Sequence, residues 1–271
     1  MTISSRTQFL PLSLPFIDFS VPNLKPETPE WDSVRSQVRK ALEEYGCFNA
    51  LFDGASKELR KALFEASEEV FDLPLETKLS AKSENVTTDT PVRFRLCLYS
   101  KAWALMLWPH GNITFSKNVQ SFAAKLSQLD VMVRTMIMES FGLEKYVEEH
   151  LNSSNNRFHL FKYKGIHNGN TEEELGLDPH IDRHFLTILC QNDVVDGLEI
   201  KTKYGEEWIK AKPSQDASYL VIAGASLHVL LNGGVFPPIH RVVITGNKDR
   251  HVAGLFLRPK EGLIINAPEE I

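Results

Sequence analysis

Two histidines and one aspartate carry the clearest chemical signal in the sequence. His180 and Asp182 are two residues apart, at the expected start of a strand. Because side chains alternate along a strand, both would lie on one face and could bind one metal ion. His240 stands at the start of another expected strand and could supply the third ligand. Two imidazoles and one carboxylate on one side of an octahedral ion leave positions open, an arrangement that suits O₂-activating Fe(II).

The second chemical signal is the charge of Arg250. This residue precedes the apolar run His251–Leu257, which is expected to form a strand. A buried guanidinium at that position would need an anionic partner. One carboxylate of a small diacid could supply that partner through two parallel hydrogen bonds. The alternative is an exposed hairpin arginine beside Asp249, and the sequence leaves both interpretations open.

The elements that must position these residues are short strands. Turn motifs such as Asp196-Gly197 and Asn232-Gly233 separate β-rich runs throughout the C-terminal part. The expected strands cover residues 158–163, 185–190, 197–202, 208–211, 219–223, 227–231, 239–245 and 251–257. So many short strands within about 100 residues favour a double-stranded β-helix, the jelly roll of cupin-like proteins.

The N-terminal part predicts helices instead. After an opening strand over 14–19, a helix is predicted over 29–45, with Thr28 as N-cap and Pro29 at its first position. Apolar residues at helical spacing predict further helices over 57–72 and 117–141. The fold class is therefore α+β, mainly β, with flanking N-terminal helices. We expect region 1–110 to pack on a jelly-roll core, 111–271 with its preceding long helix, as one integrated domain.

Composition argues against several classes of function. The 271 residues include 35 acidic and 30 basic side chains, giving a net charge of −5. No basic cluster stands out, which argues against a nucleic-acid partner. The three cysteines are scattered and suggest neither disulfides nor a structural zinc site. No apolar run approaches the ~20 residues that span a bilayer. We expect a cytoplasmic monomer without a membrane segment.

In their order and spacing, His180-x-Asp182, His240-Arg241-Val242 and Arg250 resemble the plant 2-oxoglutarate/Fe(II)-dependent dioxygenases. Supporting segments cover nearly the whole chain: Leu14–Asp18, Glu44–Phe48, Thr187–Leu189, Asp196–Glu199 and Asn232-Gly233. Within the family, the chain is most similar to dioxygenases that modify glucosinolate side chains and steroidal alkaloids. That resemblance is carried by Trp31–Arg35, Trp108–Asn112 and Glu139–Tyr146.

The resemblance implies a set of cofactors and roles. His180, Asp182 and His240 would hold Fe(II), Arg250 would bind the distal carboxylate of 2-oxoglutarate, and Tyr163 would lie near this cosubstrate. O₂ would be the oxidant, and ascorbate would stimulate the reaction. The substrate would be a small plant specialised metabolite, oxidised by hydroxylation or by desaturation or ring formation.

Some residues depart from the family pattern. Val252 stands where the family has a serine, so one hydrogen bond to the cosubstrate is lost, worth on the order of 1–3 kcal/mol. The stretch 78–108 is also shorter than in relatives. These departures leave an alternative open: a catalytically impaired or non-catalytic ligand-binding member of the same fold. His184 extends the pattern to His180-x-Asp182-x-His184, and it would face the metal if the strand stayed regular.

Overall fold

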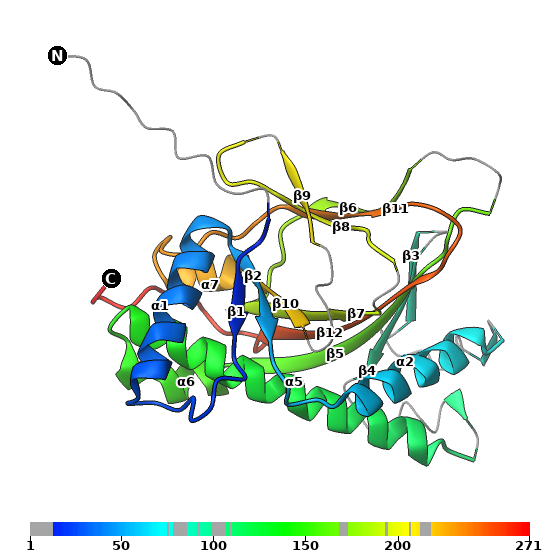
Figure 1. Cartoon of the computed structure of the whole chain (residues 1–271), viewed down its shortest axis with the longest axis horizontal. Helices are drawn as coiled ribbons and strands as arrows, with labels where there is room; N and C mark the ends of the chain where they lie inside the picture. The colour runs from blue at the N-terminus through cyan, green and yellow to red at the C-terminus, as the bar shows by residue number, and fades with distance from the viewer. Residues whose placement is uncertain are drawn as a thin grey trace.

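Two β-sheets face each other and enclose a barrel interior, with helices outside the larger sheet (Figure 1). The computed structural model describes residues 13–74, 76–77, 86–90, 93–98, 107–108, 110–167, 173–192, 195–205, 207–211 and 218–271. This architecture confirms the jelly-roll prediction.

The larger sheet, named in its spatial order, consists of β1 (Phe16–Asp18), β2 (Cys47–Leu51), β10 (Ser218–Ala223), β7 (Leu186–Gln191), β12 (Arg250–Pro259), β5 (Ser154–Tyr163), β4 (Arg93–Leu98) and β3 (Val86–Thr90). Strands β1 and β2 are parallel, and the other pairs are antiparallel. The N-terminal strands therefore complete a sheet whose centre comes from the C-terminal half.

The smaller sheet has the order β6 (Glu174–His180), β11 (His240–Ile244), β8 (Leu198–Lys201) and β9 (Trp208–Lys210). Its pairs are all antiparallel. His240 on β11 is the register partner of His180 on β6. This pairing brings together two residues that are distant in the sequence.

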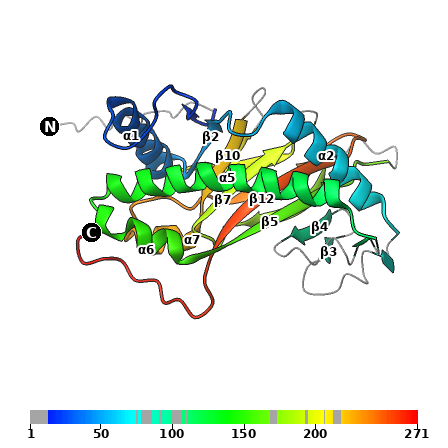
Figure 2. The same cartoon turned by 90° about the horizontal axis from the view of Figure 1, so that it is seen from below.

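Helices cover the outer face of the larger sheet. They are α1 (Pro29–Glu44), α2 (Lys57–Asp72), α5 (Ile113–Ser140), η1 (Glu144–Tyr146) and α6 (Val147–Asn152), while α7 (Ala225–Leu230) follows β10. Figure 2 shows α5 running across this sheet. The hydroxyl of Thr28 accepts from the backbone N–H of Trp31, which confirms the predicted N-cap of α1. The Asn112 side chain caps α5, so this helix begins earlier than predicted.

Alternation along the strands divides the buried residues into two clusters. One cluster fills the space between the larger sheet and the helices and includes Phe158 and Leu255. The other fills the barrel interior and includes Phe161, Tyr163 and Val252. Odd-numbered residues of β5 and even-numbered residues of β12 therefore face the interior.

Two local predictions are wrong. Residues 227–231, predicted as a strand, lie largely in helix α7. Leu227 and Leu231 are one helical turn apart and buried, whereas Val229 between them is 50% exposed, so their alternation in sequence was misleading. His180 ends strand β6, and Asp182 follows in a loop, rather than both starting a strand. Strand β6 gave no signal because it contains Gly176 and Pro179 and lacks β-branched residues.

Candidate metal and cosubstrate site

The side chains of His180, Asp182 and His240 converge at one edge of the barrel interior. One donor atom from each residue lies within 4.8 Å of the others. His180 Nε2 is 3.6 Å from Asp182 Oδ1, and His240 Nε2 is 3.9 Å from Asp182 Oδ2. The two imidazole rings are 4.2 Å apart between centroids. Two nitrogens and one carboxylate oxygen within this distance can bind a single metal ion.

Backbone carbonyls orient both imidazole rings. His180 Nδ1 lies 2.8 Å from the carbonyl oxygen of Asp178, and His240 Nδ1 lies 3.2 Å from that of Pro238. A carbonyl oxygen only accepts, so in each contact Nδ1 carries the hydrogen. In the neutral rings, Nε2 then keeps its lone pair and is directed toward the carboxylate. This second hydrogen bond is the usual way in which proteins fix a metal-binding histidine.

The protonation states suit a metal site. Burial lowers the pKa of His240 and so favours the neutral ring that a metal requires. Burial alone would raise the pKa of Asp182, but its contacts with His180, His240, His184 and Thr187 hold it well below the usual range. Thr187 Oγ1 donates to Asp182 Oδ2 at 2.5 Å. The carboxylate is therefore anionic and held in place at neutral pH.

Arg250 begins β12 and is only 2% exposed, which excludes the exposed hairpin that the sequence left open. Its Nη2 donates to Gln191 Oε1 at 2.6 Å, whereas its Nε has no hydrogen-bond partner among the described residues. Burial lowers the pKa of Arg250 from its ordinary value. A buried guanidinium with an unused N–H fits a bound carboxylate, which would complete its hydrogen bonding.

The space around Arg250 depends on Gly197. A Cβ atom on this residue would lie 2.8 Å from the carbonyl oxygen of Val243 and 3.2 Å from Arg250 Cδ. Tyr163 is the register partner of Arg250, and its ring centroid is 5.3 Å from Arg250 Cζ. Val252 is buried on the same face of β12 as Arg250 and offers no hydrogen bond. The cosubstrate roles of Tyr163, Val252 and Arg250 stay predictions.

Sequence reasoning missed Gln191. It ends β7 and is the register partner of Val252. Its Oε1 accepts from Arg250, and its Nε2 donates to the carbonyl oxygen of Ala211 at 3.3 Å. Arg60 Nη2 donates to its backbone carbonyl at 2.6 Å. Gln191 therefore holds the guanidinium of Arg250 in place. Only the pairing of β7 with β12 could have identified it.

His184 lies beside the three donors without joining them. Its Nδ1 is 3.9 Å from Asp182 Oδ1, and its ring packs against Phe256 at 5.2 Å between centroids. The chain from Ile181 to Phe185 does not continue as a regular strand, so the period-2 pattern does not place His184 as a fourth ligand. The position indicates a side chain that lines the neighbouring interior.

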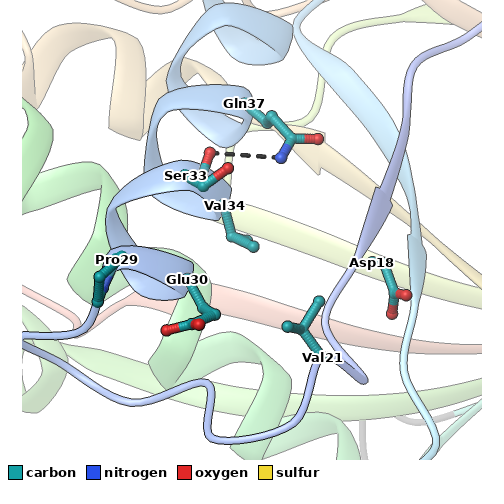
Figure 3. Close-up of a pocket in the computed structure, with 7 residues that line it drawn as sticks. All are labelled: Asp18, Val21, Pro29, Glu30, Ser33, Val34 and Gln37. Atoms are coloured by element: carbon teal, nitrogen blue, oxygen red, sulfur yellow. Dashed lines mark hydrogen bonds between the residues drawn. The ribbon is translucent and has the colours of Figure 1, made fainter.

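A hollow elsewhere on the molecule has different chemistry. Figure 3 shows the groove between the β1 region and α1, where Asp18 and Glu30 lie among apolar and neutral residues. Gln37 Nε2 donates to the carbonyl oxygen of Ser33 at 3.3 Å within this groove. It contains neither an imidazole nor a cationic group, and so it offers no comparable metal or diacid site.

A jelly roll with two histidines on paired strands and one carboxylate in the loop after one of them is typical of a non-haem Fe(II) oxygenase. Comparison with known families agrees: residues 154–259 match the 2OG-Fe(II) oxygenase superfamily, and residues 14–94 match the N-terminal region of non-haem dioxygenases in morphine synthesis. The chain belongs to the 2-oxoglutarate-dependent Fe(II) dioxygenases, a family of oxidoreductases. Fe(II) and 2-oxoglutarate are its cofactors.

Individual members of the family are similar to this chain over most of its length. It is 47% identical to the probable 2-oxoglutarate-dependent dioxygenase AOP1.2 of Arabidopsis thaliana, over 95% of this chain and 84% of that one. It is 32% identical to a probable inactive dioxygenase, AOP2, of the same plant, over 96% and 88%. The solved structure of a dioxygenase for auxin oxidation from Arabidopsis, with 2-oxoglutarate, shares the fold at a TM-score of 0.84 and 21% identity, over 95% and 97%.

In the part of the chain that the structure describes, no helix is long and apolar enough to cross a membrane. Even α5, with 28 residues, has polar and charged side chains on its outer face. This agrees with the sequence, in which no apolar run of membrane-spanning length was found.

Proposed function

We propose that this chain is an active dioxygenase that oxidises a small organic molecule, with His180, Asp182 and His240 as iron ligands and Arg250 as the residue that binds 2-oxoglutarate. One observation carries the proposal. The three donors lie within 4.8 Å of one another, and a buried guanidinium with an unused N–H faces the same barrel interior. One group fits a metal, and the other fits a carboxylate.

When bound, Fe(II) and 2-oxoglutarate supply the oxidising chemistry by activating O₂. The residues of the chain perform the remaining tasks. Asp182 contributes negative charge, and the carbonyls of Asp178 and Pro238 keep the two imidazoles oriented. Arg250 and Gln191 orient the diacid, while the apolar side chains of the interior exclude water from its surroundings.

The second candidate function is a ligand-binding member of the fold with impaired catalysis. The absence of a hydroxyl at Val252 favours it, as does the name of the 32% identical relative, a probable inactive dioxygenase. The two candidates differ in one property. Both would bind 2-oxoglutarate, but only an active enzyme would convert it to succinate in the presence of Fe(II) and O₂.

The test measures succinate from the purified chain supplied with Fe(II), ascorbate, 2-oxoglutarate and O₂. We expect iron-dependent succinate formation that is lost in His240→Ala and kept in His167→Ala, which removes an exposed histidine outside the site. Binding of 2-oxoglutarate without any succinate, with or without candidate substrates, would favour the second candidate. Failure to bind either Fe(II) or 2-oxoglutarate would contradict both.

The finer parts of the proposal concern substrate and setting. We propose a plant specialised metabolite as substrate, supported by the similarity to plant dioxygenases. We also propose that the chain has no nucleic-acid partner, which its net charge of −5 supports. We also propose a cytoplasmic monomer, for which light scattering of the purified chain and fluorescence microscopy of a tagged chain are the tests.

A further inference from the structure

Strand β12 carries a second arginine on the face that Arg250 occupies. Arg258 follows at an even spacing, so both side chains start from the interior face of the strand. At about 3.4 Å per residue, the two Cα atoms are about 27 Å apart. On the neighbouring strand β5, Arg157 is the register partner of Phe256 and shares its face. Arg157 and Arg258 thus lie together at the end of the interior opposite Arg250.

The metal donors lie next to this arginine pair. Thr187, which donates to Asp182, is the register partner of Phe256 on the other side of β12. Asp182 therefore lies close to the level of Phe256, one interior position before Arg258. The ring of His184 packs against Phe256, with its Nδ1 3.9 Å from Asp182 Oδ1. The ring of Phe256 therefore contacts His184 beside Asp182 and lies opposite Arg157 in the register.

Charge at this end of the interior is positive, because Arg157 and Arg258 lie on one face of β5 and β12 and their register partners, Phe256 and Asn155, are uncharged. Arg258 is exposed and Arg157 is partly exposed, so a ligand from solvent can reach both guanidinium groups.

We propose that Arg157 and Arg258 bind an anionic group of the organic substrate, a carboxylate or a sulfate. The inference rests on the proposed function, since it places the substrate beside the iron ligands. A guanidinium pair suits oxygen anions because each group offers parallel N–H donors. The carbon skeleton next to the anion would pack against Phe256 and His184. The oxidised C–H bond would then lie several bonds away from the anionic group.

The first experiment determines the charge preference of the wild-type chain. It uses matched sets of small aromatic and aliphatic probes, each prepared as carboxylate, sulfonate, primary amide and primary amine. Binding is measured anaerobically by ligand-observed NMR with Fe(II) and saturating 2-oxoglutarate, so that the probes do not compete for the Arg250 site. We expect carboxylates or sulfonates to bind at least about tenfold more tightly than the matched amides. Tighter binding of the carboxylates or of the sulfonates shows whether the anionic group of the substrate is a carboxylate or a sulfate.

The second experiment changes the two arginines. Arg157→Gln with Arg258→Gln should weaken the best anionic probe at least about tenfold and leave its amide nearly unaffected. A matched control, Lys40→Gln with Lys117→Gln, removes the same charge from positions on α1 and α5 outside the barrel. Arg258→Glu should shift the preference toward the amine, an inversion that a purely structural role would not produce.

The outcomes separate this inference from the proposed function. If the chain fails to bind 2-oxoglutarate, the proposed function is wrong and the inference falls with it. If 2-oxoglutarate binds but no anionic probe does, or amides bind as tightly as carboxylates, only the inference is wrong. The inference is equally wrong if Arg258→Glu folds, binds 2-oxoglutarate and keeps the preference of the wild type.

Discussion

The two arginines of β12 occupy opposite ends of one strand, and their surroundings differ. Arg250 is 2% exposed, hydrogen-bonded to a neutral amide and covered by the ring of Tyr163. Arg258 is exposed, and its register partner on β5 is Asn155, two residues from Arg157 on the same face. Water screens the charge of Arg258 but not that of Arg250. One face of one strand thus presents the same functional group in a dry and in a wet environment.

This difference indicates two modes of recognition. A buried guanidinium is costly until a carboxylate completes its hydrogen bonds, so the Arg250 end should select one small diacid strongly. An exposed pair attracts anions more weakly and leaves room for different carbon skeletons. The dry end would then fix the cosubstrate, and the wet end would decide which organic anions reach the iron ligands.

The largest expected effect lies between the two ends, at the metal donors. His180→Ala combined with His240→Ala leaves a single carboxylate, and so we expect the chain to lose its bound iron completely. The measurement is metal content after dialysis, with His167→Ala as the control that keeps its iron. Stoichiometric iron in the double variant would disprove the assignment of the three ligands.

A direct comparison of the two ends comes next in size. Arg250→Ala removes a buried charge-assisted pair, worth about 3 kcal/mol, and should raise the dissociation constant of 2-oxoglutarate about a hundredfold or more. Arg258→Ala should change that constant by less than about threefold, since an exposed charge contributes about 0–1 kcal/mol. Anaerobic titration of both folded variants is the measurement. Equal effects would show that the comparison between the two ends is wrong.

Acid stability depends on a third region, outside the barrel. His150 on α6 is 5% exposed, packs against Phe185, and its Nε2 has no hydrogen-bond partner among the described residues. Burial and then Arg134 lower its pKa to about 3. The unfolded chain protonates this histidine near pH 6.5, so the unfolded state binds more protons between pH 6.5 and 3. The stabilisation is therefore complete above about pH 6.5 and is lost as the pH falls toward about 3.

The size of this effect follows from linkage. Between about pH 7 and pH 5, His150 should reduce the free energy of unfolding by about 2 kcal/mol. His150→Phe should remove this part of the pH dependence, because a phenyl ring does not titrate. Urea unfolding of the metal-free chain at both pH values measures it, with His167→Ala as the unchanged control. An identical pH dependence in His150→Phe and wild type would contradict the prediction.

The smallest effect sharpens the description of the dry end. Val252→Ser adds a hydroxyl on the face of β12 that Arg250 occupies, which should tighten 2-oxoglutarate binding about fivefold to tenfold, or about 1–1.5 kcal/mol. Val252→Ala is the matched control for the loss of volume. The measurement is anaerobic titration of 2-oxoglutarate into wild type and both variants. Equal dissociation constants for Val252→Ser and Val252→Ala would contradict the prediction.

Much of the fold could be predicted from local signals. The predicted cap of α1 and the apolar spacing of α1 and α2 placed these helices correctly, because a helix is determined by contacts within a few residues. Segment 227–231 and strand β6 could not be predicted in this way. Their structures depend on burial against distant elements, which overrides the local pattern. The sequence also allows the apolar residues Trp103, Leu105 and Met106 to line a substrate pocket, and they lie outside the described residues.

The sequence by itself predicted His180, Asp182 and His240 as metal donors and Arg250 as the cosubstrate residue, because residue types in a fixed order indicate chemistry without coordinates. Only the tertiary structure decided that Arg250 is buried, that Gln191 holds it, and that Arg157 and Arg258 share one face of two paired strands. Each of these facts depends on strands that are distant in the sequence. Pairing register is set by packing across the whole sheet, so no local pattern contains it.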